Sequence, residues 1–155
     1  MPDSKPSKLP PDQSVIQGPV KQGNVLAFDY GLRHIGVAVA QTLTRQARGV
    51  TTLSAKQGKV RWREVNVLVE DFKPYCVVVG LPLNMDGTTS ELTSLARAFA
   101  QQLGRRFDLP AHMQDERLTS VEAQHMMADA KALGLGATDH ELAACLIAEQ
   151  FLNEN

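Results

Sequence analysis

The stretch "VLAFDYGLRHIGVAVA", residues 25–40, carries one carboxylate, Asp29, among aliphatic and β-branched residues. The short polar segment "GLR" divides the stretch into two apolar runs, a pattern that predicts two buried strands joined as a hairpin. A charge in such surroundings costs on the order of several kcal/mol unless a partner compensates it. An aspartate can also begin a turn, but three apolar residues precede Asp29 rather than a polar loop. We therefore expect a functional partner for this carboxylate.

The hydrophobic pattern outward from this stretch predicts an α/β domain. The expected strands cover residues 25–30, 34–40, 49–55, 75–82 and 111–117, and the expected helices cover residues 61–72, residues 90–107 and two segments that begin at Thr119 and Thr138. Both threonines match a capping box, since Glu122 and Glu141 follow three residues later. The order predicts a mixed five-stranded sheet, made of a three-stranded antiparallel meander and two parallel strands, with helices on both faces.

The totals indicate one domain behind a tail. Five of the eight prolines fall in the first nineteen residues, so residues 1–23 are expected to be a disordered tail and residues 24–155 the domain. No apolar run is long enough to cross a bilayer and no signal-peptide core is present, which predicts a cytoplasmic protein without a membrane partner. The two cysteines, Cys76 and Cys145, lie in apolar surroundings and are expected to be buried, reduced thiols.

Acidic residues are expected to meet at one edge of this sheet. Asp29 lies near the end of the first strand, Asp115 and Glu116 lie at the end of the last strand, and Asp139 and His140 lie in the first turn of the final helix. The carboxyl ends of parallel strands share an edge, and carboxylates gathered there require a cation, with Mg²⁺ or Mn²⁺ as the best match. Two such ions about 4 Å apart form the usual arrangement for phosphodiester hydrolysis.

Each of these residues also has a structural interpretation. Glu116 can pair with Arg117 at the end of a strand, and acidic residues in a first helical turn favour the helix dipole. His140 lies on the same helical face as the apolar residues Ala144 and Ile147, so it can be a packed core histidine. The net charge of −1 does not by itself indicate nucleic-acid binding, which would require a local basic surface.

Four motifs in order, "LAFDYGLRHIGVAVA", "VVVGLPLNMDGT", "DERLTSVEA" and "LAACLIAEQFL", resemble the bacterial YqgF-like family, whose members are described as candidate Holliday junction resolvases and pre-16S rRNA nucleases. The resemblance covers about residues 24–152 and implies an RNase H-like fold with metal-dependent nuclease activity. It assigns Asp29 to the first acidic position of the family and Glu116 to the second.

The third acidic position is where this sequence departs from the family. The family usually has an aspartate three residues before the paired alanines, and here that residue is His140. Asp139 comes one residue earlier, about 100° round the helix. Three outcomes stay open: Asp139 completes the site, His140 acts as ligand or proton carrier, or catalysis is weakened or lost. The register favours His140, with Asp139 contributing from the start of the helix.

Further polar residues are candidates for substrate binding. We expect four arginines to bind phosphates of the substrate, namely Arg33, Arg117, Arg45 and Arg48. An equal alternative is that they are solvated surface charges. Asn84 and Thr88, in the loop "GLPLNMDGT", are candidates to hold substrate, or else belong to an ordinary turn. Aromatic residues make up only 5% of the chain, which favours a structured or double-stranded nucleic acid over stacked single-stranded bases.

The first functional hypothesis is a nuclease that processes the 5′ end of pre-16S rRNA in ribosome biogenesis, with ribosomal particles as candidate partners. Branched DNA, cleaved as by a Holliday junction resolvase, is the alternative substrate. The second hypothesis is a non-catalytic nucleic-acid-binding module with a degenerate third ligand. The histidine at position 140, where the family usually has an aspartate, favours this hypothesis. A small ATP-binding protein is a third hypothesis, but such folds need two domains around the nucleotide and this chain has one.

Overall fold

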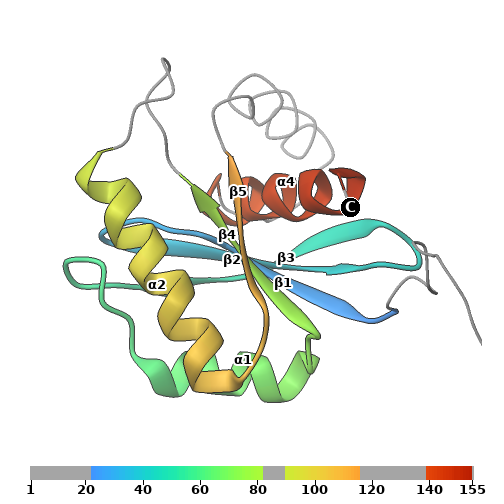
Figure 1. The fold of residues 1–155 in the computed structure, drawn as a ribbon, viewed down its shortest axis with the longest axis horizontal. Helices are drawn as coiled ribbons and strands as arrows, with labels where there is room; N and C mark the ends of the chain where they lie inside the picture. The colour runs from blue at the N-terminus through green and yellow to red at the C-terminus, as the bar shows by residue number, and fades with distance from the viewer. Residues whose placement is uncertain (1–21, 82–89, 116–138, 155) are drawn as a thin grey trace, which may run out of the picture.

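The computed structural model describes residues 22–81, 90–115 and 139–154. Its strands are β1 Asn24–Asp29, β2 His34–Gln41, β3 Gln46–Ser54, β4 Cys76–Leu81 and β5 Ala111–Asp115, and its helices are α1 Trp62–Phe72, α2 Glu91–Phe107 and α4 Asp139–Glu154. The sheet order is β3-β2-β1-β4-β5 (Figure 1). β1 pairs antiparallel with β2 and parallel with β4. β3 pairs antiparallel with β2, and β5 pairs parallel with β4. The predicted mixed five-stranded sheet is confirmed.

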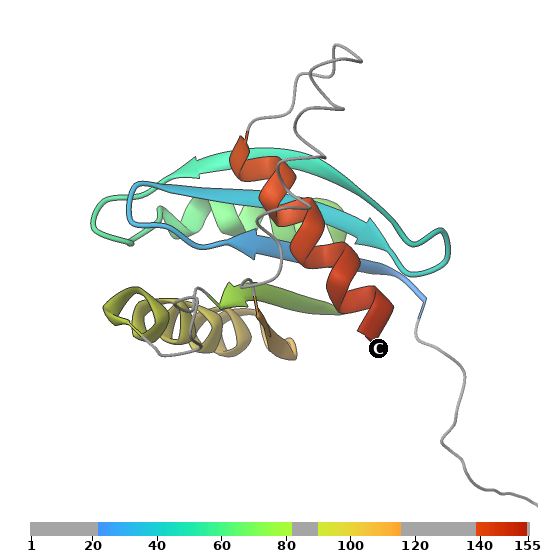
Figure 2. The same ribbon diagram turned by 90° about the horizontal axis from the view of Figure 1, so that it is seen from above.

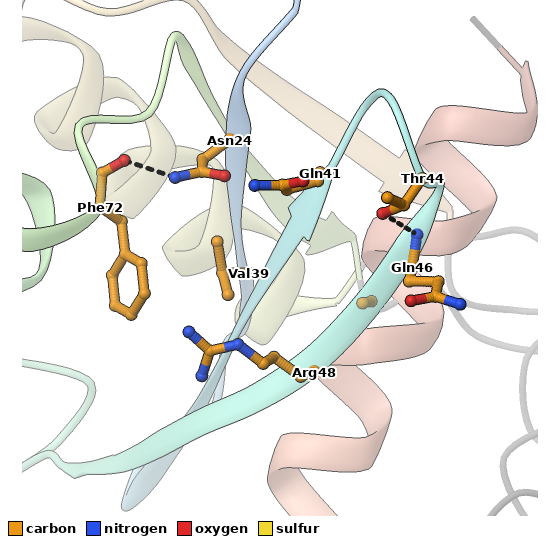
Figure 3. A pocket seen from close by; sticks show the side chains of 8 residues that line it. Asn24, Val39, Gln41, Thr44, Gln46, Arg48 and Phe72 are labelled. Atoms are coloured by element: carbon orange, nitrogen blue, oxygen red, sulfur yellow. Dashed lines mark hydrogen bonds between the residues drawn. The ribbon is translucent and has the colours of Figure 1, made fainter.

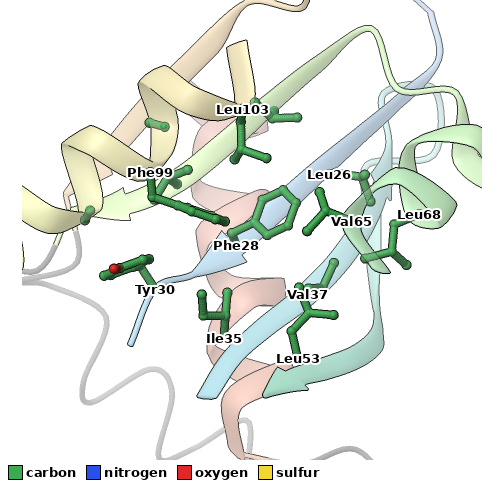
Figure 4. Close-up of a cluster of buried hydrophobic side chains, with 14 of the residues drawn as sticks. Leu26, Phe28, Tyr30, Ile35, Val37, Leu53, Val65, Leu68, Phe99 and Leu103 are labelled. Atoms are coloured by element: carbon green, nitrogen blue, oxygen red, sulfur yellow. The ribbon is translucent and has the colours of Figure 1, made fainter. Parts of the chain in front are cut away.

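The helices cover the two faces of the sheet separately. α4 crosses one face at an angle, and α1 lies behind the opposite face (Figure 2). Alternation along β1 divides the core accordingly, since Leu26 and Phe28 join the cluster of α1 and α2, whereas Val25 and Ala27 pack with α4. The larger cluster is built around Phe28 and Phe99, whose rings meet edge to face with centroids 5.6 Å apart (Figure 4). The carboxyl ends of the parallel strands β1, β4 and β5 therefore lie together at one end of the sheet.

Among the described residues, one strand boundary differs from the sequence prediction by more than one residue. β3 begins at Gln46, three residues before the expected start at Gly49. The ladder with β2 continues through Ala40 paired with Ala47 and Gln41 paired with Gln46, so pairing rather than apolar pattern defines this end of the strand. Gln46 and Arg48 are polar and exposed, and only Ala47 between them is half-buried, which explains why this segment carries no strand signal.

Other predictions fall outside the described residues. These include nearly all of the tail at 1–23, the helix that begins at Thr119, the Thr138 cap and the last two residues of the strand 111–117. α4 is described from Asp139 onward, so its predicted cap is not tested.

Both cysteines are buried and free, which confirms their expected state. Burial, with the carboxylates of Glu149 and Glu141 as further causes, raises the pKa of the Cys145 thiol to about 12. A thiol with such a pKa stays protonated at neutral pH and is a poor nucleophile. No helix within the described ranges is both long and apolar enough to span a bilayer.

Candidate active site at the carboxyl ends of the parallel strands

Asp29 stands at the edge of the sheet where the parallel strands end. It is the last residue of β1, and the ends of β4 and β5 lie beside each other at the same edge through the pairing of Leu81 with Asp115. The Asp29 side chain is half-buried and follows Val25 and Ala27 in the alternation of the strand. The carboxylate therefore lies on the face of the sheet that α4 covers.

The first turn of α4 rests on the sheet next to Asp29. Gly36 of β2 pairs directly with Asp29, and a Cβ atom added to Gly36 would clash with the backbone carbonyl of His140. Only glycine permits such an approach between the helix backbone and the sheet. Two segments more than 100 residues apart in the sequence thus meet at one strand end.

His140 packs against a second histidine that sequence reasoning missed. The rings of His34 and His140 lie with centroids 5.0 Å apart and planes at 33°. His34 shares the face of Gly36, two residues along β2, and is diagonal to Asp29 across the pair of strands. Diagonal neighbours in an antiparallel pair are about 7–8 Å apart. The alternation of side chains along "HIG" could have indicated that His34 faces the same side of the sheet as Gly36. The contact of His34 with His140, however, depends on where α4 crosses the sheet.

The two acidic neighbours of His140 are placed differently. Glu141 lies over β3, where one of its carboxylate oxygens accepts a hydrogen bond from Thr52 Oγ1 at 3.3 Å. Asp139 is exposed at the first described position of the helix, whereas His140 is half-buried against the sheet. Of the two candidates for the third site position, His140 is therefore the one that packs against the sheet, next to His34.

β5 contributes a second set of polar groups on the same face. Gln114 is buried, and its Nε2 atom donates to both carboxylate oxygens of Glu154 at 3.3 and 3.2 Å. His112, two residues earlier, contacts the Phe151 ring of α4 with centroids 5.0 Å apart. Even-numbered positions of β5 therefore face α4, as Asp29 does. Asp115 ends the strand and borders a hollow of about 360 Å³ with Gln114 and Glu154.

The predicted substrate-binding arginines separate into two groups. Arg33 lies exposed in the β1–β2 turn at the Asp29 edge, where its carbonyl accepts a hydrogen bond from Ala55 N at 2.8 Å. Arg45 belongs to the opposite end of the sheet and donates through Nη1 to the carbonyl of Leu152 at 2.9 Å. Arg48 points toward Phe72 in a hollow of about 340 Å³ at that same far end (Figure 3). Of these three arginines, only Arg33 is beside the candidate site.

Four predicted site residues lie outside the described residues, namely Glu116, Arg117, Asn84 and Thr88. Within the described ranges, no group of three or more His, Cys, Asp and Glu side chains is placed to hold a metal ion. Asp29 supplies a hard oxygen donor and His140 an imidazole nitrogen, which suit Mg²⁺ or Mn²⁺ only when further oxygen ligands join them. The donor chemistry of Asp29 and His140 fits a divalent cation that takes further ligands.

Residues 23–154 match the family model of RuvX, described as a Holliday junction resolvase. The chain belongs to the RuvX family. RuvX is a family of nucleases, so the expected enzyme class, a hydrolase acting on phosphodiester bonds, is confirmed. The family match starts one residue before β1 and ends with α4, and so includes every element of the sheet edge described above.

Related RuvX proteins carry the name of candidate pre-16S rRNA nuclease. A protein of Azotobacter vinelandii is 47% identical over 132 residues, covering 84% of this chain and 93% of its own length. One from Pseudomonas fluorescens SBW25 is 43% identical over 134 residues, with 84% and 92% covered. Another, from Pseudomonas putida KT2440, is 53% identical over 100 residues, covering 64% of this chain and 71% of the relative.

Solved structures show the same fold at low sequence identity. RuvC of Thermus thermophilus, in complex with a Holliday junction substrate, matches with a TM-score of 0.54 and 16% identity over 82% of this chain and 90% of RuvC. The fowlpox virus resolvase, in complex with Holliday junction DNA, matches with a TM-score of 0.52 and 9% identity over 84% and 97% of the two chains. These similarities confirm the RNase H-like fold expected from the sequence.

Proposed function

We propose that this chain is a divalent-metal-dependent endonuclease for structured RNA, that its substrate is the 5′ region of pre-16S rRNA, and that it acts in the cytoplasm. The observation that carries the proposal is the packing of the α4 start over Gly36, which brings His140 to the strand end that holds Asp29. The names of the relatives at 43–47% identity favour RNA. The description of the family favours branched DNA as the second candidate substrate.

In this proposal Asp29, Glu116 and His140 hold Mg²⁺ or Mn²⁺, and the exposed Asp139 contributes from the start of α4. Glu116 is preferred over Asp115 because it matches the second acidic position of the family motif, within "DERLT". A bound pair of these ions would supply an activated water and stabilise the leaving oxygen.

The side chains around the cations orient the substrate and move protons. His140 carries an imidazole, a group that can bind a metal ion or transfer a proton, and its contact with His34 restricts the orientation of the ring. Arg33 is exposed at the same edge and is assigned to a flanking phosphate, as is Arg117. Asn84 and Thr88 are assigned as hydrogen-bond donors to the sugar–phosphate backbone.

Cleavage of two labelled substrates under an Mn²⁺ titration tests this proposal. We expect the purified chain to cut a pre-16S rRNA fragment at a defined position, to lose this activity in EDTA, and to cut a four-way DNA junction at least about 10-fold more slowly. Faster cleavage of the junction would reassign the substrate to branched DNA. Tight binding of both nucleic acids without any metal-dependent cut would make the chain a binding module and overturn the proposal.

A further inference from the structure

A tight turn between β3 and α1 lies at the same end of the sheet as Asp29. Ser54, the last residue of β3, pairs with His34, the first residue of β2, and the turn follows directly. Lys56 and Lys59 exchange two backbone hydrogen bonds of 2.9 and 3.0 Å. The central residues have positive φ values, 52° at Gln57 and 81° at Gly58, as in a type I′ hairpin turn.

Two hydrogen bonds fix this turn to the strand end that carries Asp29. Tyr30, the next residue after Asp29, donates its hydroxyl to the Gly58 carbonyl at 2.8 Å, and Gly58 N donates to the Leu32 carbonyl at 2.9 Å. Burial raises the pKa of Tyr30, so its hydroxyl stays a donor at neutral pH. A Cβ atom on Gly58 would clash with the Tyr30 hydroxyl. The turn is therefore held at the Asp29 end of the sheet, on the side of Tyr30 and Phe99 rather than on the α4 face.

The turn presents two lysines side by side. Residues that flank a two-residue hairpin turn are directly paired, and their side chains leave from the same side. Lys56 and Lys59 are both exposed, and neither has an ion-pair partner among the described residues. Like charges placed directly opposite each other destabilise a pair. Arg33 is a third cationic residue near this turn. Its backbone carbonyl accepts a hydrogen bond from the backbone N–H of Ala55, the residue before Lys56.

A hollow lies between the turn and α2. It measures about 360 Å³ and is bordered by Tyr30, Lys59, Trp62, Phe99 and Gln102, among others. Trp62 stacks on Phe99, and Arg106 lies 4.4 Å from the Trp62 ring centroid, so neighbouring side chains already occupy this ring. The site therefore favours an anion at the lysines over a base stacked in the hollow.

We propose that Lys56 and Lys59 bind two phosphate groups of the substrate backbone next to the candidate active site. This inference rests on the proposed nuclease function, because the phosphates belong to its nucleic-acid substrate. β3 is two strand spacings, about 10 Å, from β1, so phosphates bound at the turn would lie within a few nucleotides of the cleaved bond. Contacts of this kind supply affinity and register without reading sequence.

The double variant Lys56→Gln, Lys59→Gln tests the inference through the salt dependence of binding. The probe is a fluorescent duplex fragment of pre-16S rRNA, titrated by anisotropy with Asp29→Asn in every background so that no cleavage interferes. Each lysine that contacts a phosphate contributes about one to the slope of log K against log salt. We expect the slope to fall by about 2 in magnitude and the affinity at 100 mM salt to fall at least about 10-fold.

Lys73→Gln is the matched control, because Lys73 ends α1 near Asn24, at the opposite end of the sheet. We expect its salt slope to equal that of the parent. In the background with Asp29 intact, the double variant should raise KM and leave kcat unchanged. A parental slope in the double variant, with the wild type still binding and cleaving, would overturn this inference alone. Failure of the wild type to bind or cleave any nucleic acid would overturn the proposed function as well.

Discussion

Replacing Gly36 by alanine is expected to destabilise the fold by about 3 kcal/mol, at the upper end of the cost of overpacking. The added methyl group would clash with the carbonyl of His140, a backbone group that cannot turn aside as a side chain can. The first turn of α4 would have to lift from the sheet, and His140 would move away from Asp29. Urea unfolding of the variant and the wild type measures the change.

Gly104→Ala is a suitable control for the Gly36 variant. A Cβ atom at Gly104, within α2, would lie 3.2 Å from the Leu109 carbonyl oxygen, a tight contact that the gain in helix propensity of about 1 kcal/mol offsets. Its stability should stay within about 1 kcal/mol of the wild type. An equally small change for Gly36→Ala would show that α4 does not rest on the sheet at this point.

We expect Asp29→Asn to lower kcat for RNA cleavage by about 10³-fold. Losing a group that stabilises charge in the transition state has an effect of this size. Asparagine keeps the size of the side chain and removes the charge that attracts a divalent cation. Single-turnover cleavage at saturating Mn²⁺ measures the effect, and thermal unfolding verifies that the variant is folded. Asp71→Asn, which changes an exposed carboxylate of α1, should cleave at the wild-type rate.

The same assay distinguishes the two candidates for the third site position. His140 packs against His34 at the sheet, whereas Asp139 is exposed. We therefore expect His140→Ala to lose more activity than Asp139→Asn. The reverse order would assign the third position to Asp139, and equal wild-type activity in both variants would remove α4 from the catalytic machinery.

The fold and the place of Asp29 could be predicted from sequence because both depend on local pattern. Apolar runs on both sides of "GLR" define the hairpin, and an aspartate at the end of a buried strand stands at the edge where parallel strands end. The start of β3 could not be predicted in this way, because its exposed residues are held by backbone pairing with β2.

Features of the site that depend on tertiary contacts could not be predicted. The choice between Asp139 and His140 depends on where α4 begins and how it crosses the sheet, which a spacing in the sequence does not determine. His34 gains its importance only through its contact with His140. In the sequence, Lys56 and Lys59 look like ordinary charged loop residues. Only the structure shows that the hydrogen bond from Tyr30 connects their turn to the strand that holds Asp29.

The most direct test is anomalous diffraction from crystals of the full chain soaked in Mn²⁺. We predict an Mn²⁺ peak about 2.1 Å from a carboxylate oxygen of Asp29, with Glu116 and the start of α4 completing the ligands. Mn²⁺ ordered elsewhere on the molecule, with no peak at Asp29, would contradict a metal-dependent active site at this edge of the sheet.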